Sequence, residues 1–551
     1  MRSRSALTDA QTAEALGAAW LERVLEPVSR AGRLAKDGLR PFAPGQESEA
    51  RAAAAEVLQT AQRCGEGQAR TLREILRRLP EPGATLALVA AGGTIDDAEL
   101  TGLLLFLEGL RTLRERGRGL LPERLLPESL EDLYAHLARG RTRGGGFYLD
   151  DAFDPALAHV RSAAERARQD YACERARLRA AAEAVLGDAA REDGEFAIMR
   201  DTFAGPAPAC VHVLREAPLY RIFELSDDAA ALAALAVLEA AREQVATAEE
   251  RVREALALEL CGRAGALLAQ ARRAGEIDLH LGAAIFAQEH HAVAAEIVAD
   301  RELTIVEGRL LPLEQRLAEQ GRRYVPISFE LRGQAVITGP NMGGKSAALR
   351  TAGFIQLCAQ WGLPVPARSA RLGLVSSIRW LGGAAGDERD GLLSSFGNEI
   401  VALAGALDET APAARLLLID EFARSTSPRE GRALVVALLQ ALRERGELAL
   451  ATTHFANVAE ATGVPHYAVA GVRRVLAQPG LAKPALAEAL RMIGEAMDYR
   501  LVPASLAGAA GEDAIALARL LGLDGRLIAH AERELRAARS PEEERRDAWI
   551  R

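Results

Sequence analysis

The run AVITGPNMGGKS at residues 335–346 constrains the fold of this 551-residue chain more than any other feature. Four residues typical of a strand lead into a glycine-rich turn, and the sequence AALRTAGFIQLCAQW that follows has the spacing of a helix. A strand, a turn and a helix in this order are the context that the pattern G-x-x-x-x-G-K-S requires. The run therefore predicts an α/β domain built around this turn.

A turn of this kind binds phosphate through its backbone. Its glycines let N–H groups point inward, and the positive end of the following helix adds to the attraction. Lys345 would reach the β- and γ-phosphates, and the Ser346 hydroxyl would hold Mg²⁺. ATP and Mg²⁺ are therefore the expected cofactors. The residues expected to contact the nucleotide here are Gly339, Pro340, Asn341, Met342, Gly343, Gly344, Lys345, Ser346 and Ala347.

Two later strands end in polar residues that suit the same chemistry. LLLIDE at residues 416–421 predicts a buried strand ending in Asp420, a candidate Mg²⁺ carboxylate, and Glu421, a candidate base for the attacking water. LALATTHF at residues 448–455 predicts a strand ending near His454, which could face the γ-phosphate, with a structural role as the alternative. The predicted catalytic residues are Lys345, Glu421 and His454, and the predicted metal ligands are Ser346 and Asp420.

The length of the chain predicts several domains, since one hydrophobic core rarely serves so many residues. Two long Ala-rich tracts, residues 156–186 and 227–274, flank a short mixed stretch that is expected to be a hairpin or loop. This pattern resembles a two-helix lever arm with a small tip, but it also fits an ordinary helical bundle with a loop, and periodicity alone does not separate the two. The predicted organisation has four parts: an N-terminal helical segment (1–40), a helical core with lever arms and a reduced tip at about 187–225 (41–302), an α/β ATPase domain (303–498), and a C-terminal return to helix with a charged tail (499–551).

Composition limits the partners. No stretch of about 18 uncharged apolar residues occurs, and the amphipathic N-terminus does not resemble a signal sequence, so we expect a cytoplasmic protein with no membrane partner. The net charge of −8 gives no general attraction to a phosphate backbone. Charge alone therefore leans against nucleic acid as a partner.

The amino-acid sequences of these motifs resemble those of the MutS family of DNA mismatch-repair ATPases. ITGPNMGGKS (residues 337–346) is similar to the family's phosphate-binding loop, and IDEFARSTSPREG (419–431) to its acidic strand end and the loop that follows. SSFGNEI (394–400) resembles its signature segment and TTHF (452–455) its histidine switch. The fold implied is a helical core and lever domain, then an ABC-like P-loop ATPase domain, then a small helical dimerisation segment.

The resemblance also implies a partner subunit. In this family the signature serines act on the nucleotide of the other subunit, so Ser394 and Ser395 are expected to contact ATP across a homodimer. Three residues depart from the family pattern: Ala423 and Ser425 replace glycines that usually follow the acidic pair, and Leu392 replaces another before the signature serines. The sequence before the helical core is expected to be too short for the family's mismatch-reading and connector domains.

Two functions of different classes follow from the resemblance. The first is a MutS-like dimeric ATPase that couples ATP hydrolysis to lever movement and binds DNA by its geometry without reading mismatches. The second is a protein-remodelling ATPase that reactivates an adenosylcobalamin-dependent enzyme such as lysine 5,6-aminomutase. The expected arm tip favours the second, since residues 191–222 hold four arginines and five acidic residues.

Overall fold

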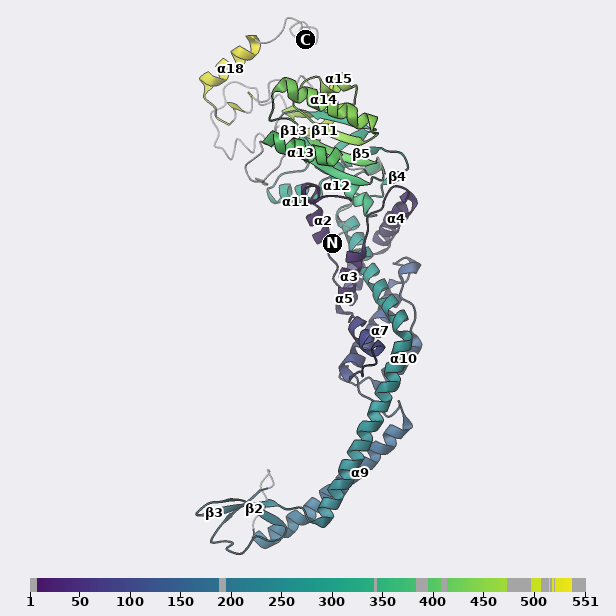
Figure 1. The fold of residues 1–551 in the computed structure, drawn as a ribbon, viewed down its shortest axis with the longest axis vertical. Helices are drawn as coiled ribbons and strands as arrows, with labels where there is room; N and C mark the ends of the chain where they lie inside the picture. Colours follow the sequence, from purple (N-terminus) through teal and green to yellow (C-terminus); the bar gives the residue numbers. More distant parts are fainter. Residues whose placement is uncertain are drawn as a thin grey trace. The chain divides into compact units, whose positions relative to one another are not determined.

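The structure is a computed structural model that describes residues 7–187, 195–340, 344–382, 395–407, 414–472, 497–506, 515, 518–519 and 521–537. Within these residues it is a mixed helical and α/β protein (Figure 1). The α-helices are α1 (Ala10–Leu16), α2 (Ala18–Val24), α3 (Arg30–Gly38), α4 (Glu47–Arg63), α5 (Glu66–Arg78), α6 (Gly83–Ala90), α7 (Asp97–Gly117), α8 (Glu131–Leu137), α9 (Pro155–Leu186), α10 (Ala229–Glu289), α11 (Leu311–Glu319), α12 (Lys345–Gln360), α13 (Ser395–Leu407), α14 (Pro428–Glu444), α15 (Val458–Thr462) and α18 (Gly525–Ala537).

The described strands form three sheets. A three-stranded sheet has the order β1-β3-β2, a six-stranded sheet the order β13-β12-β7-β11-β10-β9, and a four-stranded sheet the order β4-β8-β5-β6. In the six-stranded sheet the strands run parallel, except that β13 is antiparallel to β12. The strands are β1 (Glu195–Met199), β2 (Val211–Glu216), β3 (Tyr220–Leu225), β4 (Glu296–Val298), β5 (Leu303–Gly308), β6 (Ile327–Leu331), β7 (Gln334–Thr338), β8 (Ser369–Gly373), β9 (Ser377–Gly382), β10 (Arg415–Asp420), β11 (Leu448–Thr452), β12 (His466–Val472) and β13 (Met497–Pro503).

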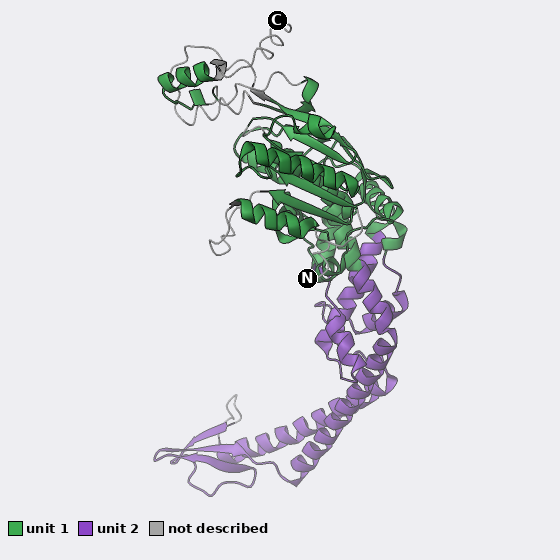
Figure 2. Cartoon of the chain, turned by 45° about the horizontal axis from the view of Figure 1, so that its top comes forward, with its two compact units in different colours: residues 1–77, 116–126, 274–551 green, residues 78–115, 127–273 purple. Residues whose placement is uncertain are grey.

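The chain divides into two compact units (Figure 2). The first holds residues 1–77, 116–126 and 274–551, and the second holds residues 78–115 and 127–273. In the second unit α9 packs on α10 through Ala167, Leu238 and Ala241. One face of the β1-β3-β2 sheet is buried against the end of α9, and Phe196 and Phe223 are fully buried there. This unit is thus a helical body with a small sheet, the tip sheet, between α9 and α10.

Helices cover both faces of the six-stranded sheet in the first unit. Along β10, Leu416 and Leu418 belong to the hydrophobic cluster that contains α12, while Leu417 and Ile419 belong to the cluster that contains α14. Successive residues of a strand point to opposite faces, so a strand buried on both sides reads as a continuous apolar run. Figure 1 shows α12 and α14 on opposite sides of the strands. This burial explains the run LLLI in the sequence.

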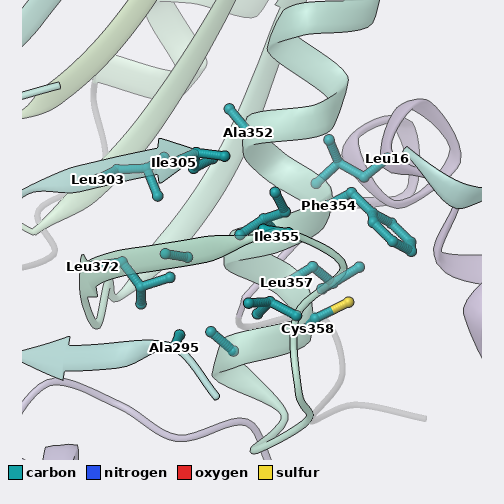
Figure 3. Close-up of a cluster of buried hydrophobic side chains, with 14 of the residues drawn as sticks. Leu16, Ala295, Leu303, Ile305, Ala352, Phe354, Ile355, Leu357, Cys358 and Leu372 are labelled. Atoms are coloured by element: carbon teal, nitrogen blue, oxygen red, sulfur yellow. The ribbon is translucent and has the colours of Figure 1, made fainter. Parts of the chain in front are cut away.

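The N-terminal helices complete the core of the first unit. Leu16 of α1 is fully buried beside Phe354 of α12 (Figure 3). The contact is close because Gly353 has no side chain, and a Cβ there would lie 2.4 Å from the Leu16 side chain. The backbone continues the contact, since Leu7 O accepts a hydrogen bond of 2.7 Å from Ile378 N of the edge strand β9. Residues 7 and 16 therefore support α12 and the edge of the sheet, although they lie far in sequence from the predicted nucleotide-binding motifs.

A buried carboxylate fastens the end of α10 to these N-terminal helices. Asp278 Oδ2 accepts hydrogen bonds of 2.7 Å from both the backbone N and the Oγ of Ser29, and Asp278 Oδ1 accepts one of 3.2 Å from Arg73 Nε. Gly32 lies against the same carboxylate, where a Cβ would be 2.4 Å from it. A buried charge needs such partners, so this network fixes the C-terminal part of α10 within the first unit.

Most predicted elements are confirmed. The strands expected at residues 335–338, 416–421 and 448–455 are β7, β10 and β11, and the first long helical tract is α9. The short stretch after α9 forms the tip sheet, so a hairpin with a third strand is present. The division into four segments stays a prediction.

One prediction about the C-terminal region is wrong. The chain does not return to helix at Tyr499, since residues of β13 pair antiparallel with β12. Leu501 is buried in the large core there. Among the described helices, none combines the length and apolar character needed to cross a membrane.

Candidate functional site

The glycine-rich turn joins β7 to α12, as the sequence predicts. Gly339 and Gly344 have φ angles of 145° and 88°, values that favour glycine. A Cβ on Gly344 would also lie 3.2 Å from the Tyr499 ring, a tight contact that adds to the preference of this backbone conformation for glycine. Asn341, Met342 and Gly343 lie outside the described residues. Ala347 lies in the first turn of α12, and Pro340 closes the described part of the turn before it.

Lys345 is the first residue of α12, and its side chain turns back to the loop. Its side chain is 5% exposed, and Nζ donates hydrogen bonds of 2.9 Å to Gly339 O and 3.1 Å to Pro340 O. Nζ also lies 3.1 Å from Glu421 Oε1. The predicted phosphate-binding lysine and the predicted base are therefore direct partners.

Asp420 ends β10 beside the N-terminus of α12. Its Oδ1 accepts a hydrogen bond of 3.0 Å from Ser346 Oγ and another of 2.8 Å from Thr452 Oγ1. The neighbouring strand comes close because Gly382 pairs with Asp420, where a Cβ would lie 2.5 Å from that of Asp420. The structure thus brings together both predicted metal ligands.

Glu421 follows directly and has an uncommon backbone conformation. Its φ is 51°, and its backbone N donates a hydrogen bond of 3.0 Å to Thr452 Oγ1. Burial raises the pKa of Glu421, but the Lys345 ammonium and then Arg424 outweigh burial and hold that pKa below its usual value. Arg424 Nη1 lies 2.9 Å from Oε2. Glu421 is therefore kept ionised.

Two other candidate residues lie apart from these contacts. His454 follows β11 and is exposed, and its ring contacts the ring of Phe455 at a centroid distance of 4.2 Å. Tyr324 lies near the strand that opens the α/β domain, and its sequence position allows either stacking on adenine or core packing. In the structure it packs against the large core. Its hydroxyl lies 2.7 Å from Thr351 Oγ1, and burial raises its pKa to about 12. These contacts favour the core role for Tyr324.

Known proteins match this part of the chain. The sequence model of the family described as MutS domain V matches residues 335–478, which contain the turn, Asp420, Glu421 and His454. A DNA mismatch repair protein MutS from Granulibacter bethesdensis is 30% identical over 418 residues, covering 71% of this chain and 44% of the relative. The chain belongs to the MutS family.

Other MutS relatives match over shorter stretches. A DNA mismatch repair protein MutS from Desulfosudis oleivorans is 36% identical over 225 residues, covering 38% of this chain and 25% of the relative. An Endonuclease MutS2 from Clostridium botulinum is 36% identical over 188 residues, covering 33% and 23%. The chain therefore spans less than half the length of these MutS proteins. The comparisons give no support to the aminomutase alternative.

The segment that resembles the MutS signature is only partly described. Ser394 lies outside the described residues, and Ser395 is placed as the first residue of α13. Glu399, one turn further along α13, accepts a hydrogen bond of 2.8 Å from Ala423 N in the loop after Glu421. The MutS-like signature segment and the acidic loop are thus in direct contact.

Sequence reasoning missed two residues of this site. Thr452 is 1% exposed and bonds to both acidic residues, and Glu399 holds the loop that follows them. Thr452 could have been found from its register, since parallel strands that place Asp420 opposite Thr452 bring the two together. Glu399 lies in the segment SSFGNEI that resembles the family's signature, but no pattern in the sequence indicated its contact with Ala423.

Proposed function

We propose that the chain is a MutS-like P-loop ATPase that works as a homodimer and couples ATP binding and hydrolysis to movement of the helices α9 and α10. The observation that carries this proposal is the hydrogen bond between Ser346 Oγ and Asp420 Oδ1. It joins the phosphate-binding turn to the acidic strand end, which are 74 positions apart in the sequence. The MutS domain V match over the same residues supports the assignment.

The donor set fits Mg²⁺. A hydroxyl and a carboxylate oxygen 3.0 Å apart are hard oxygen ligands of the kind that Mg²⁺ takes in nucleotide sites, alongside phosphate oxygens and water. Ser346 and Asp420 would hold the ion, and Thr452 would keep the Asp420 carboxylate oriented. When bound, Mg²⁺ neutralises charge on the β- and γ-phosphates.

Lys345 and Glu421 exchange partners in the proposed reaction. In the structure, Lys345 Nζ lies 3.1 Å from Glu421 Oε1 and neutralises it. With ATP bound, Lys345 turns to the β- and γ-phosphates, and Glu421 is free to orient the attacking water and accept its proton. His454 would face the γ-phosphate, and Ser394 and Ser395 would approach the nucleotide of the second subunit.

The ATPase assignment is tested by phosphate release from ATP. We expect the purified chain to release phosphate with Mg²⁺, and we expect release to stop when EDTA removes the ion, because Ser346 and Asp420 act through it. The measurement is the steady-state rate over a Mg²⁺ titration. An equal rate with EDTA would contradict the role of the two ligands.

DNA is the first candidate partner, because two of the relatives are named as DNA mismatch repair proteins. A protein partner is the second candidate, and the tip sheet favours it. Arg200 pairs with Glu216 at 3.2 Å, and Arg221 donates to Phe203 O at 2.6 Å and lies over the Phe223 ring. Side chains used in this way are poorly placed to neutralise phosphates.

Salt-dependent binding of labelled duplex and branched DNA separates the two candidates. If the chain binds DNA as proposed, its affinity at low salt is tighter than about 10 µM and falls as salt rises, because phosphate contacts release counterions. The titration is made with and without ATP and Mg²⁺. Affinity no tighter than about 10 µM under all conditions would remove DNA and leave the protein partner.

A further inference from the structure

The loop after β10 carries backbone strain at two residues. Glu421 has φ of 51° and Ala423 has φ of 60°, in the left-handed region that residues with a Cβ adopt at a cost of about 1–2 kcal/mol each. Ala423 is fully buried. Such a conformation persists only where neighbouring contacts hold it.

Within the described part of the chain, α13 supplies such a contact. Glu399 Oε2 accepts a hydrogen bond of 2.8 Å from Ala423 N, and Ser425 Oγ donates to Glu399 Oε1 at 3.5 Å. One carboxylate therefore spans the turn from Ala423 to Ser425. A hydrogen bond to an ionised acceptor is stronger than one between neutral groups.

The turn also has contacts on the side of α14. A Cβ on Gly431 would lie 2.9 Å from Ala423 O and 2.4 Å from the Phe455 ring, so α14 and the residue after His454 already pack closely against it. The Ala423 carbonyl accepts from Thr426 N at 3.3 Å. The N–H of Ala423 is thus held by Glu399 and its carbonyl by the loop itself. Among the described residues, Glu399 therefore supplies the hydrogen bond to Ala423 that comes from another element.

We propose that Glu399 is a positioning residue for ATP hydrolysis, which holds the left-handed turn at Ala423 and through it the backbone of Glu421. The proposal rests on the proposed ATPase function and adds a residue to it. Glu399 does not touch the reacting atoms. Glu421 lies two residues before Ala423. By holding the turn, Glu399 fixes the direction from which the Glu421 carboxylate approaches the attacking water.

The test combines changes on both sides of the contact. Glu399→Ala removes the acceptor and is expected to lower the single-turnover rate on the order of 10-fold, with ATP affinity within about 2-fold, since the net value of such a bond corresponds to about that factor. Glu399→Gln keeps a neutral acceptor and is expected to fall between the wild type and Glu399→Ala. Glu444→Ala, an exposed residue at the end of α14, is the matched control and leaves the rate unchanged.

The variant Ala423→Gly tests whether Glu399 acts through the turn at residue 423. Glycine adopts positive φ without a Cβ penalty, so the turn depends less on Glu399. Adding Ala423→Gly to Glu399→Ala is expected to restore the rate to within about 3-fold of Ala423→Gly alone. A general disturbance of α13 would not be rescued at position 423, so an unrescued loss overturns the proposal.

Hydrogen exchange tests the contact between Glu399 and Ala423 independently of ATP hydrolysis. Deuterium uptake by peptides covering residues 421–427 is expected to rise in Glu399→Ala, because the Ala423 amide loses its acceptor. Unchanged uptake and an unchanged rate in Glu399→Ala would overturn the positioning role of Glu399. If the wild type hydrolyses ATP, the proposed ATPase function would still hold. A folded wild type that releases no phosphate would instead refute the proposed function itself, and the positioning role with it.

Discussion

Glu421→Gln lowers ATP turnover by about 10²- to 10⁴-fold while ATP remains bound, because a positioned general base contributes about that factor. Gln has nearly the same shape as Glu but cannot accept the proton of the attacking water. The variant also removes the charge that Lys345 contacts at 3.1 Å in the structure, which leaves the ammonium available for phosphate. The measurement is single-turnover hydrolysis beside equilibrium ATP binding.

The control is Glu444→Gln, the same chemical change at an exposed residue at the end of α14. Its rate and ATP affinity should match those of the wild type. If Glu421→Gln hydrolyses ATP within about 3-fold of the wild-type rate, Glu421 is not the base and the account of the strand end is wrong.

Glu447→Gln is expected to destabilise the first unit by about 3–5 kcal/mol, since it removes one charge of a buried ion pair with Arg415. Glu447 and Arg415 are each 2% exposed and lie at the amino ends of β11 and β10. Glu447 Oε1 accepts from Arg415 Nε at 2.8 Å and from Nη2 at 2.5 Å, and Oε2 accepts from Arg415 N at 3.0 Å. The measurement is the free energy of unfolding in urea, followed by tryptophan fluorescence.

Two further variants test whether the loss of stability in Glu447→Gln comes from the buried ion pair with Arg415. Glu289→Gln removes a carboxylate from an exposed ion pair with Arg70 in the same unit and should cost less than about 1 kcal/mol. Arg415→Met combined with Glu447→Gln removes both charges but keeps an acceptor for the backbone N of residue 415. It should be more stable than Glu447→Gln alone. A cost below about 1 kcal/mol for Glu447→Gln would show that the pair does not hold the sheet together.

The local part of the site could be predicted from the sequence. The apolar run LLLI marks β10 because both faces of that strand are buried, and the glycines of the turn mark backbone conformations that other residues avoid. Both signals lie within a few residues of the side chains that are predicted to act on the nucleotide. The positions of Lys345, Asp420 and Glu421 at element ends follow from such local patterns.

The parts of the site and of the fold that the sequence does not predict depend on contacts between segments that are distant in the chain. The contact of Glu399 with Ala423 crosses 24 positions, and that of Leu7 with Ile378 joins the N-terminus to the edge of the sheet. Such pairs leave no periodic pattern, because each needs only one side chain or one carbonyl. The strand at Tyr499 escapes prediction because MDYRLVP contains Asp498 and Arg500 and so lacks the apolar run that marks β10.

The central claim is that the turn at residues 339–346 binds ATP for hydrolysis through Lys345. It is tested most directly by phosphate release from ATP with Mg²⁺, comparing the wild-type 551-residue chain with Lys345→Met, which removes the charge but keeps a long side chain. We expect the wild type to turn over ATP and the variant to lose at least about 100-fold in rate, with both chains folded, because Lys345 stabilises the phosphate charge in the transition state. A folded wild type without phosphate release, or equal rates in the two proteins, would contradict the account.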